Sequence, residues 1–490
     1  MAAAPVGRVG DLAVEVRTGS SFGCTRPNTA PLRSCWRSLA DRSQALPSHA
    51  SFTRQRIAVV GSGISGLSAA WLLSKRHEVV LYEADNRLGG HAHTVQADGT
   101  AVDTGFIVYN EPNYPNLTAL FAHLGVETAA SDMSFGVSLD DGALEYSSSN
   151  LLAQKRNLVN PRFLGMLLDV MRFYRSGTRD ARALEADGGF CRLADYLDAQ
   201  GFGRAFQEDH LLPQAAAIWS ASLRDIREFP AGTFLRFFDN HGLMLPIDKR
   251  PIWRTVAGGS ARYVAALAAD MDGEILLSRP VRWIARHADH VVVEDGAGQA
   301  RSFDQVVVAA HADQALAMLA RPSAEETALL GAFRYSRNRA VLHRDRSLMP
   351  RRAAAWASWN HVGRRGVQGE GGVTYWMNRL QPMEGAEPCF LSLNPDRAPG
   401  EVLHDQVYEH PLFDGPAMAA QARLWSLQGV RRTWFAGAYF GSGFHEDGLQ
   451  AGLAVAEQLG GVRRPWLTPK PSGRIFLDAP AAAREAELVA

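Results

Sequence analysis

The sequence predicts an α/β fold in which a Rossmann-like domain is interleaved with an α+β domain that contains a mixed sheet. Three observations lead to this prediction. An apolar strand from Arg56 runs into a glycine-rich turn and a helix, a second strand from Glu78 ends in an acid, and two apolar, glycine-containing segments return late in the chain. Strand, turn, helix, strand and acid within roughly thirty residues is the order of a nucleotide-binding βαβ unit.

The glycine-rich turn has the spacing G-x-G-x-x-G, and each glycine has a predicted role. Gly61 permits the tight turn, Gly63 lets the backbone approach a pyrophosphate, and Gly66 lets the helix pack close to the strand. The helix is expected to begin near Ile64, where its free N-terminal amides would meet the anion. The contacts predicted in this turn are Gly61, Ser62, Gly63, Ile64, Ser65 and Gly66.

The second strand, Glu78 to Tyr82, is followed by Glu83. This is the distance past the glycines at which an acidic side chain meets ribose hydroxyls. A tight structural turn without a ligand is the alternative, because glycine-rich turns also occur by chance. The complete order of strand, glycines, helix, strand and acid favours the dinucleotide site.

The segment from Glu83 indicates whether the bound dinucleotide contains a flavin or a nicotinamide. It reads E-A-D-N-R-L-G-G-H-A-H-T and resembles the E-A-x-x-R-x-G-G-R-x-x-T segment of the flavin-containing amine oxidase and phytoene desaturase superfamily. The resemblance implies FAD as the cofactor, bound by a GR2-type domain. The contacts that it implies here are Ala84, Arg87, Gly89, Gly90 and His91. His91 is a departure, because the superfamily usually has an arginine there and the charge of an imidazole depends on pH.

Two distant segments are similar to later cofactor segments of the same superfamily. Residues 275–310 read as a hairpin that leads into a valine-rich strand, and the resemblance implies contacts at Val281 and Ala310. Residues 432–459 read as a strand, a glycine-rich loop and a helix from about Glu446, whose N-terminus would face the isoalloxazine ring. The contacts implied there are Gly437, Glu446, Gly448 and Leu449.

A further segment, D-T-G-F-I-V-Y from Asp103, follows a predicted hairpin turn at Asp98-Gly99. In relatives the matching Asp-x-Gly passes near the flavin, so the resemblance implies contacts at Asp103, Thr104 and Gly105. The longer stretch D-T-G-F-I-V-Y-N-E-P-N-Y-P-N-L also resembles a bacterial subgroup described as NAD/FAD-binding or amine-oxidase-like. That resemblance leaves the substrate open.

The superfamily builds its cofactor domain from discontinuous pieces, and these segments set the expected boundaries. The FAD-binding domain is expected from 55–105, 250–320 and 425–462, and the substrate domain from 106–249 and 321–424. Within the latter, helices are expected to dominate from Pro115 to about His241, and strands beyond Phe333. Residues 1–54 are expected to be a disordered extension and 463–490 a peripheral tail.

Composition agrees with a large flavoenzyme and excludes other classes. The 490 residues, 46% of them apolar, are enough for two large cores. Basic and acidic residues both number 51, so no global charge attracts nucleic acid. Four scattered cysteines without a C-x-x-C pair argue against zinc, iron-sulfur or disulfide sites and favour the reducing cytoplasm. The chain has no run of about eighteen uncharged apolar residues that would span a membrane.

Two apolar clusters have alternative interpretations. The stripe Phe163, Met166, Leu167, Val170, Met171 and Tyr174 suits core packing, the rim of a greasy tunnel or a shallow membrane contact. A second cluster, around Asn240-His241-Gly242, suits either a core or a long hydrophobic substrate. Its members are Phe234, Leu235, Phe237, Phe238, Leu243, Met244 and Leu245. The histidines at 210, 241, 343, 361 and 445 are not at ligand spacing, so no metal is expected. We expect a cytoplasmic protein and keep a peripheral membrane contact open.

The expected chemistry is transfer of a hydride from a hydrophobic small-molecule substrate to flavin N5, followed by reoxidation by oxygen or another acceptor. Desaturation or isomerisation of a fatty-acyl or other lipid-like chain is the first hypothesis. An amine oxidase acting on a CH–NH₂ group is the alternative, although no lysine lies between Lys249 and Lys470 and the expected cage position holds Phe444. A flavoprotein that binds FAD structurally or passes electrons to a partner is a third.

His445 is the leading candidate for a group near the reactive ring edge, because it directly precedes the predicted start of the closing helix. Helix capping or packing is the alternative role for this side chain.

Overall fold

Five parallel strands form the sheet that carries the glycine-rich turn, in the order β10-β2-β1-β14-β20. The structure, a computed structural model, describes residues 53–187, 189–219, 221–246, 249–365 and 371–477. The five strands are β1 (Arg56–Val60), β2 (Glu78–Tyr82), β10 (Gly273–Leu276), β14 (Gln305–Val308) and β20 (Thr433–Phe435). They come from three distant blocks of the sequence, as expected for a cofactor domain built from discontinuous pieces.

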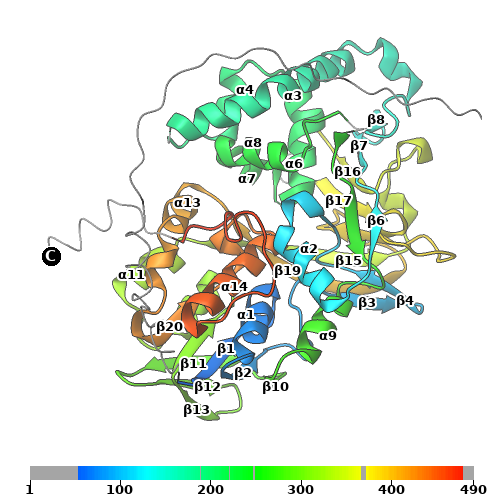
Figure 1. The fold of residues 1–490 in the computed structure, drawn as a ribbon. Helices are drawn as coiled ribbons and strands as arrows, with labels where there is room; N and C mark the ends of the chain where they lie inside the picture. The colour runs from blue at the N-terminus through cyan, green and yellow to red at the C-terminus, as the bar shows by residue number, and fades with distance from the viewer. Residues whose placement is uncertain (1–52, 188, 220, 247–248, 366–370, 478–490) are drawn as a thin grey trace, which may run out of the picture. The chain divides into compact units, whose positions relative to one another are not determined.

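Helices α1 (Ile64–Ser74) and α14 (His445–Gly460) pack against each other beside this sheet (Figure 1). Every residue of α1 is buried, which explains why the helix is apolar on all sides. Glycines make the close contact with α14: a Cβ at Gly448 would stand 2.8 Å from Ser65 Oγ, and one at Gly452 would overlap the carbonyl oxygen of Ser65. The close packing holds the N-termini of both helices at the same end of the sheet.

A three-stranded antiparallel sheet follows β10 and has the hairpin expected between residues 275 and 310. Its strands are β11 (Val281–Arg286), β12 (Val291–Asp295) and β13 (Ala300–Phe303). Asp295 forms the expected turn, because its Oδ1 accepts hydrogen bonds from the amides of Ala297 (2.9 Å) and Gln299 (3.0 Å). Helices α10 (Ala312–Met318) and α11 (Ala324–Leu330) come after β14.

The second large sheet has seven strands in the order β19-β15-β18-β17-β16-β7-β8. Its strands are β7 (Phe135–Leu139), β8 (Leu144–Ser147), β15 (Arg334–His343), β16 (Trp359–Gly363), β17 (Gly371–Trp376), β18 (Phe390–Leu393) and β19 (Val402–Leu412). β16 and β7 run parallel, and the other pairs are antiparallel. The predicted mixed sheet is therefore confirmed.

A layer of helices lies at the far end of this sheet from the five-stranded one (Figure 1). It contains α3 (Pro161–Asp187), α4 (Leu193–Ala199), α5 (Arg204–Phe206), α6 (Leu212–Trp219), α7 (Leu223–Arg227) and α8 (Ala231–Asn240), with a π-helical turn at Gln207–Leu211. Phe163 and Met166 of the apolar stripe on α3 are buried, as core packing requires, whereas Met171 is exposed. None of the helices in the described ranges is long and apolar enough to cross a membrane.

The prediction that helices dominate from Pro115 was wrong for residues 128–147. This stretch forms β6 (Thr128–Ser131), β7 and β8, between α2 (Pro115–Leu124) and the helical layer. All five residues of β7 are buried, so the strand lacks the polar alternation by which a half-buried strand is recognised. Its parallel partner β16 lies more than two hundred residues later, and a sequence window does not contain that pairing.

Smaller elements complete the described chain. They are β3 (Thr94–Ala97), β4 (Thr100–Asp103), β5 (Tyr109–Asn110), β9 (Trp253–Val256), α9 (Ala261–Ala269), α12 (Met377–Leu380) and α13 (Gly415–Gln421). Short 3₁₀ turns lie at Glu111–Asn113, Lys155–Val159, Arg346–Leu348, Ala353–Ala355, Leu424–Leu427, Val430–Arg432 and Ala438–Phe440.

The segment 463–477 is packed onto the cofactor domain, although we expected a peripheral tail from 463. Arg464 is buried and pairs with Glu457 at 2.8 Å, and the Trp466 ring stacks on Trp71 at 5.9 Å. Arg474 reaches Asp447 of α14. Paired arginines and an aromatic stack explain how a proline-containing segment is held in place. The expected extension, up to residue 52, and residues 478–490 lie outside the described residues.

Candidate functional site

A cavity of about 750 Å³ borders both large parts of the fold, from the glycine-rich turn to the helical layer. Most residues predicted to contact the cofactor line it. These are Gly61, Ser62, Gly63, Ile64, Ser65, Glu83, Ala84, Gly89, Gly90, His91, Thr104, Gly105, Val281, Ala310 and Gly437. The candidate catalytic residue His445 lines it as well. The structure therefore brings segments that are hundreds of residues apart to one cavity.

The three glycines of the turn have three different surroundings. Gly61 has a φ of +96°, and a Cβ there would meet the Ala309 carbonyl oxygen at 2.6 Å. A Cβ on Gly66 would overlap the carbonyl oxygen of Gly61, so this glycine is required for the close packing of α1 on the turn. A Cβ on Gly63 would meet no protein atom within 4 Å. The space beside Gly63 is the space that a pyrophosphate would need.

Glu83 is held at the end of β2 by the turn itself. Its Oε2 accepts hydrogen bonds from the Ser62 amide at 2.8 Å and the Ser62 hydroxyl at 2.5 Å, and its Oε1 accepts one from the Asp85 amide at 2.8 Å. A carboxylate oxygen has capacity for further donors. The arrangement fixes the carboxylate at the cavity wall, where ribose hydroxyls would reach it.

The double glycine approaches the first turn directly. Gly89 and Gly90 have φ angles of +105° and +55°, and a Cβ on Gly90 would stand 3.1 Å from the Cα of Gly63. Arg87 lies outside the cavity lining, and its guanidinium donates a hydrogen bond to the Gly90 carbonyl at 2.9 Å. Arg87 thus holds the loop in shape, and the predicted direct contact stays a prediction.

His91, at the position where an arginine is usual, belongs to a group of imidazoles. Its ring lies 5.3 Å from that of His410 and 6.3 Å from that of His311, and all three line the cavity. Burial and the neighbouring histidines hold the pKa of His91 well below its usual value. The ring is therefore neutral at physiological pH, and its buried Nε2 has no hydrogen-bond partner among the described residues.

Asp103 points away from the cavity. Its carboxylate accepts hydrogen bonds from the amide and hydroxyl of Ser260, from Thr94 Oγ1 at 2.6 Å and from Gln381 Nε2 at 2.8 Å. Burial raises the pKa of Asp103 to about 6, although these hydrogen bonds oppose the shift. Ser260 precedes α9, so Asp103 anchors that helix to the β3–β4 hairpin. Its neighbours Thr104 and Gly105 do line the cavity.

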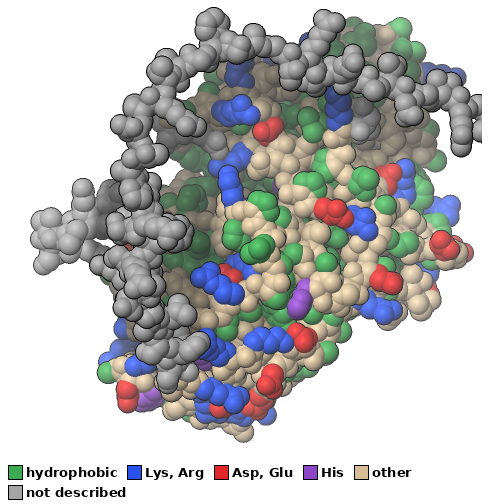
Figure 2. All heavy atoms as spheres, viewed as in Figure 1, with side chains coloured by type: hydrophobic (Ala, Val, Ile, Leu, Met, Phe, Trp, Pro, Cys, Tyr) green, Lys and Arg blue, Asp and Glu red, His purple; other side chains and the backbone are tan. Residues whose placement is uncertain are grey.

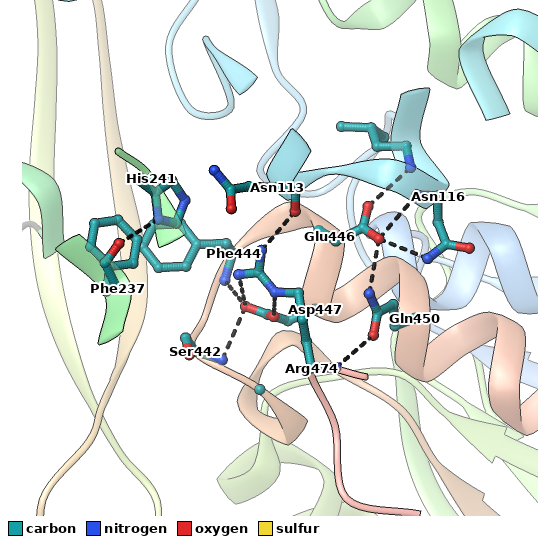
Figure 3. Close-up of polar contacts among 12 residues, drawn as sticks. Asn113, Asn116, Phe237, His241, Ser442, Phe444, Glu446, Asp447, Gln450 and Arg474 are labelled. Carbon is teal, nitrogen blue, oxygen red and sulfur yellow. Dashed lines mark hydrogen bonds and ion pairs between the residues drawn. The ribbon is translucent and has the colours of Figure 1, made fainter. Parts of the chain in front are cut away.

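Glu446 also points elsewhere, toward the first turn of α2 (Figure 3). It accepts hydrogen bonds from the Asn116 amide at 3.1 Å and the Leu117 amide at 3.0 Å, and from Gln450 Nε2 at 2.9 Å. Burial raises its pKa. The carboxylate thus caps the N-terminus of α2. Gly448 and Leu449 lie in the contact between α14 and α1 and not at the cavity, which leaves their predicted contacts untested.

His445 is the first residue of α14 and is enclosed by aromatic rings. It stacks on Phe106 with ring centroids 3.9 Å apart, and its Nε2 lies 2.6 Å from the Tyr263 hydroxyl. Burial lowers the pKa of His445 to about 3, so the imidazole is neutral at physiological pH. A neutral imidazole that is hydrogen-bonded to a tyrosine is able to form a further hydrogen bond with a group in the cavity. It carries no charge that would attract an ion.

The part of the cavity beyond the glycine loops has an aromatic and aliphatic wall. Phe237 of α8 stacks on Phe444 with ring centroids 4.9 Å apart, and Trp219 lies 4.6 Å from Phe237. The other side chains on this wall are Met133, Ile218, Leu243, Trp253, Trp359, Tyr375 and Leu393. Of these wall residues the sequence analysis singled out Phe237, Leu243 and Phe444. The others come from α6 and strands scattered through the chain, and their apolar character alone did not mark them.

His241 is the polar group within this wall (Figure 3). Its Nδ1 lies 2.9 Å from the Phe237 carbonyl oxygen and therefore donates to it, because a carbonyl only accepts. Burial lowers the pKa of His241 to about 3, so the ring is neutral and its Nε2 carries a lone pair. Nε2 has no partner within the described ranges. The described residues contain no group of three or more histidine, cysteine or acidic side chains able to hold a metal.

Comparison with known proteins identifies the family. A family model for flavin containing amine oxidoreductase matches residues 64–342. A putative flavin-containing monoamine oxidase of Mycobacterium tuberculosis is 26% identical over 256 residues, which are 50% of this chain and 55% of that protein. The chain therefore spans about half the length of this curated relative. A diapophytoene desaturase of Staphylococcus aureus is 37% identical over 59 residues, 12% of either chain.

Solved structures share the fold at low sequence identity. The fatty acid isomerase of P. acnes that produces CLA aligns with a TM-score of 0.60 at 16% identity, over 83% of this chain and 98% of that one. Putrescine oxidase bound to putrescine aligns with a TM-score of 0.61 at 14% identity, over 83% and 99%. At such identities the alignment shows the fold alone, and the predicted fold class is confirmed.

The cavity fits the cofactor that this family carries. The free space at Gly63, the uncapped N-terminus of α1 and the carboxylate of Glu83 suit a dinucleotide with a pyrophosphate and a ribose. Val281, Ala310 and Gly437 line the same space. Those residues would hold the group between the glycine turn and the aromatic wall.

Proposed function

The chain belongs to the flavin-containing amine oxidoreductase family. We propose that it is an FAD-dependent oxidoreductase whose substrate is a long apolar molecule, first of all a fatty-acyl chain, which it desaturates or isomerises. The observation that carries this proposal is the apolar wall opposite the glycine loops, built from Trp219, Phe237, Phe444 and their neighbours. Pockets bind the part of a ligand that their walls match in polarity.

When bound, FAD would accept a hydride from the substrate; a desaturation would then need oxygen or another two-electron acceptor to reoxidise the flavin, whereas an isomerisation would not. The residues of this chain orient the substrate and exclude water. Aromatic side chains on α6 and α8 would pack along an alkyl chain and remove its surface from water. In a desaturation the substrate loses a hydride and a proton from adjacent carbons, and in an isomerisation both are returned. His241 Nε2 is an unpaired hydrogen-bond acceptor on this wall, able to hold a polar group of the substrate.

The same wall argues against an amine substrate. A cation bound between two parallel rings needs a gap of about 7 Å, since each aromatic contact takes about 3.5 Å. Phe237 and Phe444 stack on each other at 4.9 Å and leave no such gap. No lysine is among the described residues that line the cavity. These features support the acyl hypothesis over the amine oxidase alternative.

The names of similar proteins are consistent with both hypotheses, an acyl substrate and an amine substrate, so an experiment has to distinguish them. The Mycobacterium tuberculosis relative is named for monoamine oxidation, and the P. acnes neighbour for fatty acid isomerisation. We would incubate the purified holoenzyme with fatty-acyl lipids and separately with primary amines, and analyse the products by mass spectrometry. Loss of two hydrogens from the lipid, or a moved double bond at constant mass, supports the proposal. Release of ammonia and an aldehyde with no change in any lipid overturns it.

A matched pair of variants sharpens this experiment. Trp219→Ala removes a ring from the cavity wall, and Trp283→Ala removes an exposed ring from β11, away from the cavity. We expect Trp219→Ala to raise the KM for the lipid about tenfold or more while flavin content stays normal, because a buried indole contributes several kcal/mol of apolar contact. Trp283→Ala should behave as the unmodified protein.

A further inference from the structure

One face of α3 carries large apolar side chains that no other part of the described chain covers. Leu164, Leu168 and Met171 are exposed, Leu168 to 64%, and their spacing of four and three residues places them on one side of the helix. The opposite side is buried through Phe163, Met166 and Phe173. The helix is therefore apolar on two faces, and the protein core accounts for only one of them.

The exposed apolar surface begins before the helix. Leu158 and Val159, in the 3₁₀ turn that leads into α3, are exposed, Val159 to 80%. We call Leu158, Val159, Leu164, Leu168 and Met171 the α3 face. Single exposed apolar residues are ordinary on a protein surface, but a contiguous group marks an interaction site.

Basic side chains surround the α3 face. Residues 151–184 contain seven arginines and lysines and two aspartates. Lys155, Arg175 and Arg182 are exposed, and none of them makes an ion pair within the part of the chain that the structure describes. The acids packed against the helix are already engaged: Asp169 pairs with Arg172, and Glu208 and Asp209 pair with Arg162. Figure 2 shows lysine and arginine side chains over the layer of helices that contains α3.

A second group of exposed apolar side chains lies after α8. Leu243 and Trp253 line the cavity, while Leu245 and Ile252 are exposed, Ile252 to 72%. Met244 and Arg250 contact the buried side of α3, since a Cβ at Gly177 would overlap Met244 Sδ and Arg250 lies over the Tyr174 ring at 5.9 Å. This group is therefore separate from the α3 face.

We propose that the α3 face docks this protein on the surface of a membrane that contains anionic phospholipids. The five apolar side chains would enter the boundary between headgroups and acyl chains, and Lys155, Arg175 and Arg182 would lie against lipid phosphates. A helix with an apolar face flanked by arginine and lysine, and too polar to span the bilayer, has the features of an interfacial anchor. From residue 151 to the end of α3 at Asp187 the basic residues outnumber the acidic ones by seven to four, and Asp169, Asp180, Glu208 and Asp209 are each paired with an arginine, which suits a negatively charged partner. The docking proposal holds whatever the substrate is.

The test is cosedimentation of the full-length holoenzyme with vesicles. Vesicles of phosphatidylcholine with phosphatidylglycerol are compared with vesicles of phosphatidylcholine alone. We expect binding to the anionic vesicles that weakens as salt is raised. Leu164→Ser, Leu168→Ser and Met171→Ser together should weaken it about tenfold or more. The control is Trp283→Ser, Val402→Ser and Val430→Ser, three exposed apolar residues on other elements, which should bind as the unmodified protein does.

A second set of variants tests the charges. Lys155→Glu, Arg175→Glu and Arg182→Glu should remove the preference for anionic vesicles, whereas Arg262→Glu, Arg282→Glu and Arg346→Glu, at exposed arginines elsewhere, should keep it. Flavin content and thermal midpoint confirm that each variant is folded. The proposal would be overturned if the serine and glutamate variants of the α3 face bound vesicles as well as their control variants do. It would also be overturned if the unmodified protein stayed in the supernatant. A dimer that the serine variants convert to a monomer would show that a second copy covers the face instead.

Failure of the docking proposal is separate from failure of the proposed function. Flavin reduction by a short, soluble acyl substrate does not need a membrane, so the α3 variants should retain it. If they retain it and vesicle binding is unchanged, docking alone is wrong. If the vesicles bind as expected and no acyl substrate reduces the flavin, the substrate assignment alone is wrong.

Discussion

Gly63 is the glycine at which substitution separates cofactor binding from folding. Its φ is −59°, which any residue adopts, and an added Cβ would meet no protein atom within 4 Å. Gly63→Val should therefore fold, but its branched side chain would fill the space that the pyrophosphate needs. We predict that FAD binding weakens by about a hundredfold or more, roughly 3 kcal/mol, in a fluorescence titration of the apoprotein.

Gly165→Val is the control for this prediction. Gly165 lies in α3, away from the cavity, and a Cβ there also meets nothing within 4 Å. Its flavin content should be normal. Normal FAD affinity in Gly63→Val would contradict the assignment of the turn, whereas loss of flavin in both variants would point to a general effect of valine on folding.

Glu83 is predicted to contribute to FAD affinity with little effect on stability. Glu83→Ala removes a carboxylate that is held at the cavity wall by Ser62 and Asp85, and hydrogen bonds to a charged group contribute about 1.5–3 kcal/mol. We expect FAD affinity to fall about tenfold to a hundredfold by titration, with a folded apoprotein. Glu78→Ala, which breaks only the exposed pair with Arg56, should leave the affinity unchanged. An unaltered affinity in Glu83→Ala would remove Glu83 from the site.

Some residues occupy positions that contact the cofactor in the superfamily, but their side chains point away from the cavity in this structure. Asp103 bonds to Ser260 and Gln381, and Glu446 bonds to Asn116, and these partners are between 150 and 340 residues away. A local motif predicts where the backbone passes. It contains no information about which distant amide a carboxylate will reach, so side-chain direction could not be predicted from the sequence at these positions.

At the scale of elements, Glu446 is predicted to stabilise the junction between α14 and α2. The carboxylate of Glu446 accepts hydrogen bonds from the amides of Asn116 and Leu117, and Figure 3 shows it beside Asn116. Glu446→Ala would leave both amides buried without an acceptor. We predict that the free energy of unfolding falls by about 2–4 kcal/mol, measured by denaturant titration of the holoenzyme. The flavin absorption spectrum should be unchanged. A shifted spectrum at normal stability would instead favour the direct cofactor contact that the resemblance implies.

The elements of the cofactor domain were predictable because their signals are local. The strand before Gly61, the helix from Ile64 and the strand that ends at Tyr82 have the boundaries that the glycine spacing indicates. The strands β7 and β8 were not predictable in the same way. They are buried on both faces. β7 is stabilised by pairing with β16, which lies far along the chain, and β8 by pairing with β7. The aromatic wall is similar, because Trp219 and Trp359 meet only after the sheet and the helical layer have formed.

For the whole molecule, buried histidines predict a loss of stability in mild acid. Burial lowers the pKa of His210, His361 and His410 to about 4, and of His241 and His445 to about 3, from a usual value of about 6.5. Between about pH 4 and 6.5 the unfolded chain therefore binds protons that the folded chain does not. Stability falls as the pH is lowered through this range, by up to about 1.4 kcal/mol per pH unit for each such proton.

Asp103 and Glu446 act in the opposite direction, since burial raises the pKa of each, that of Asp103 to about 6, and the folded state therefore binds these protons first, but they are two groups against five. We expect the thermal midpoint to decrease steadily from pH 7 to pH 5 in scanning fluorimetry. His361→Gln should make this decrease less steep, because burial is the cause of the His361 shift. A midpoint that is constant or rises toward pH 5 would contradict the neutral state assigned to these rings.

For the whole molecule, the central account is that an apolar substrate meets FAD at the aromatic wall of the cavity. The most direct test of that account is the flavin absorption of the purified holoenzyme under anaerobic conditions, recorded before and after fatty-acyl lipids are added and, in a separate sample, primary amines. We predict that the flavin band bleaches with the lipid and not with the amines, because the cavity wall offers apolar contact and the rings of Phe237 and Phe444 stack on each other without a gap for a cation. Bleaching by amines alone would contradict the account and establish the amine oxidase in its place.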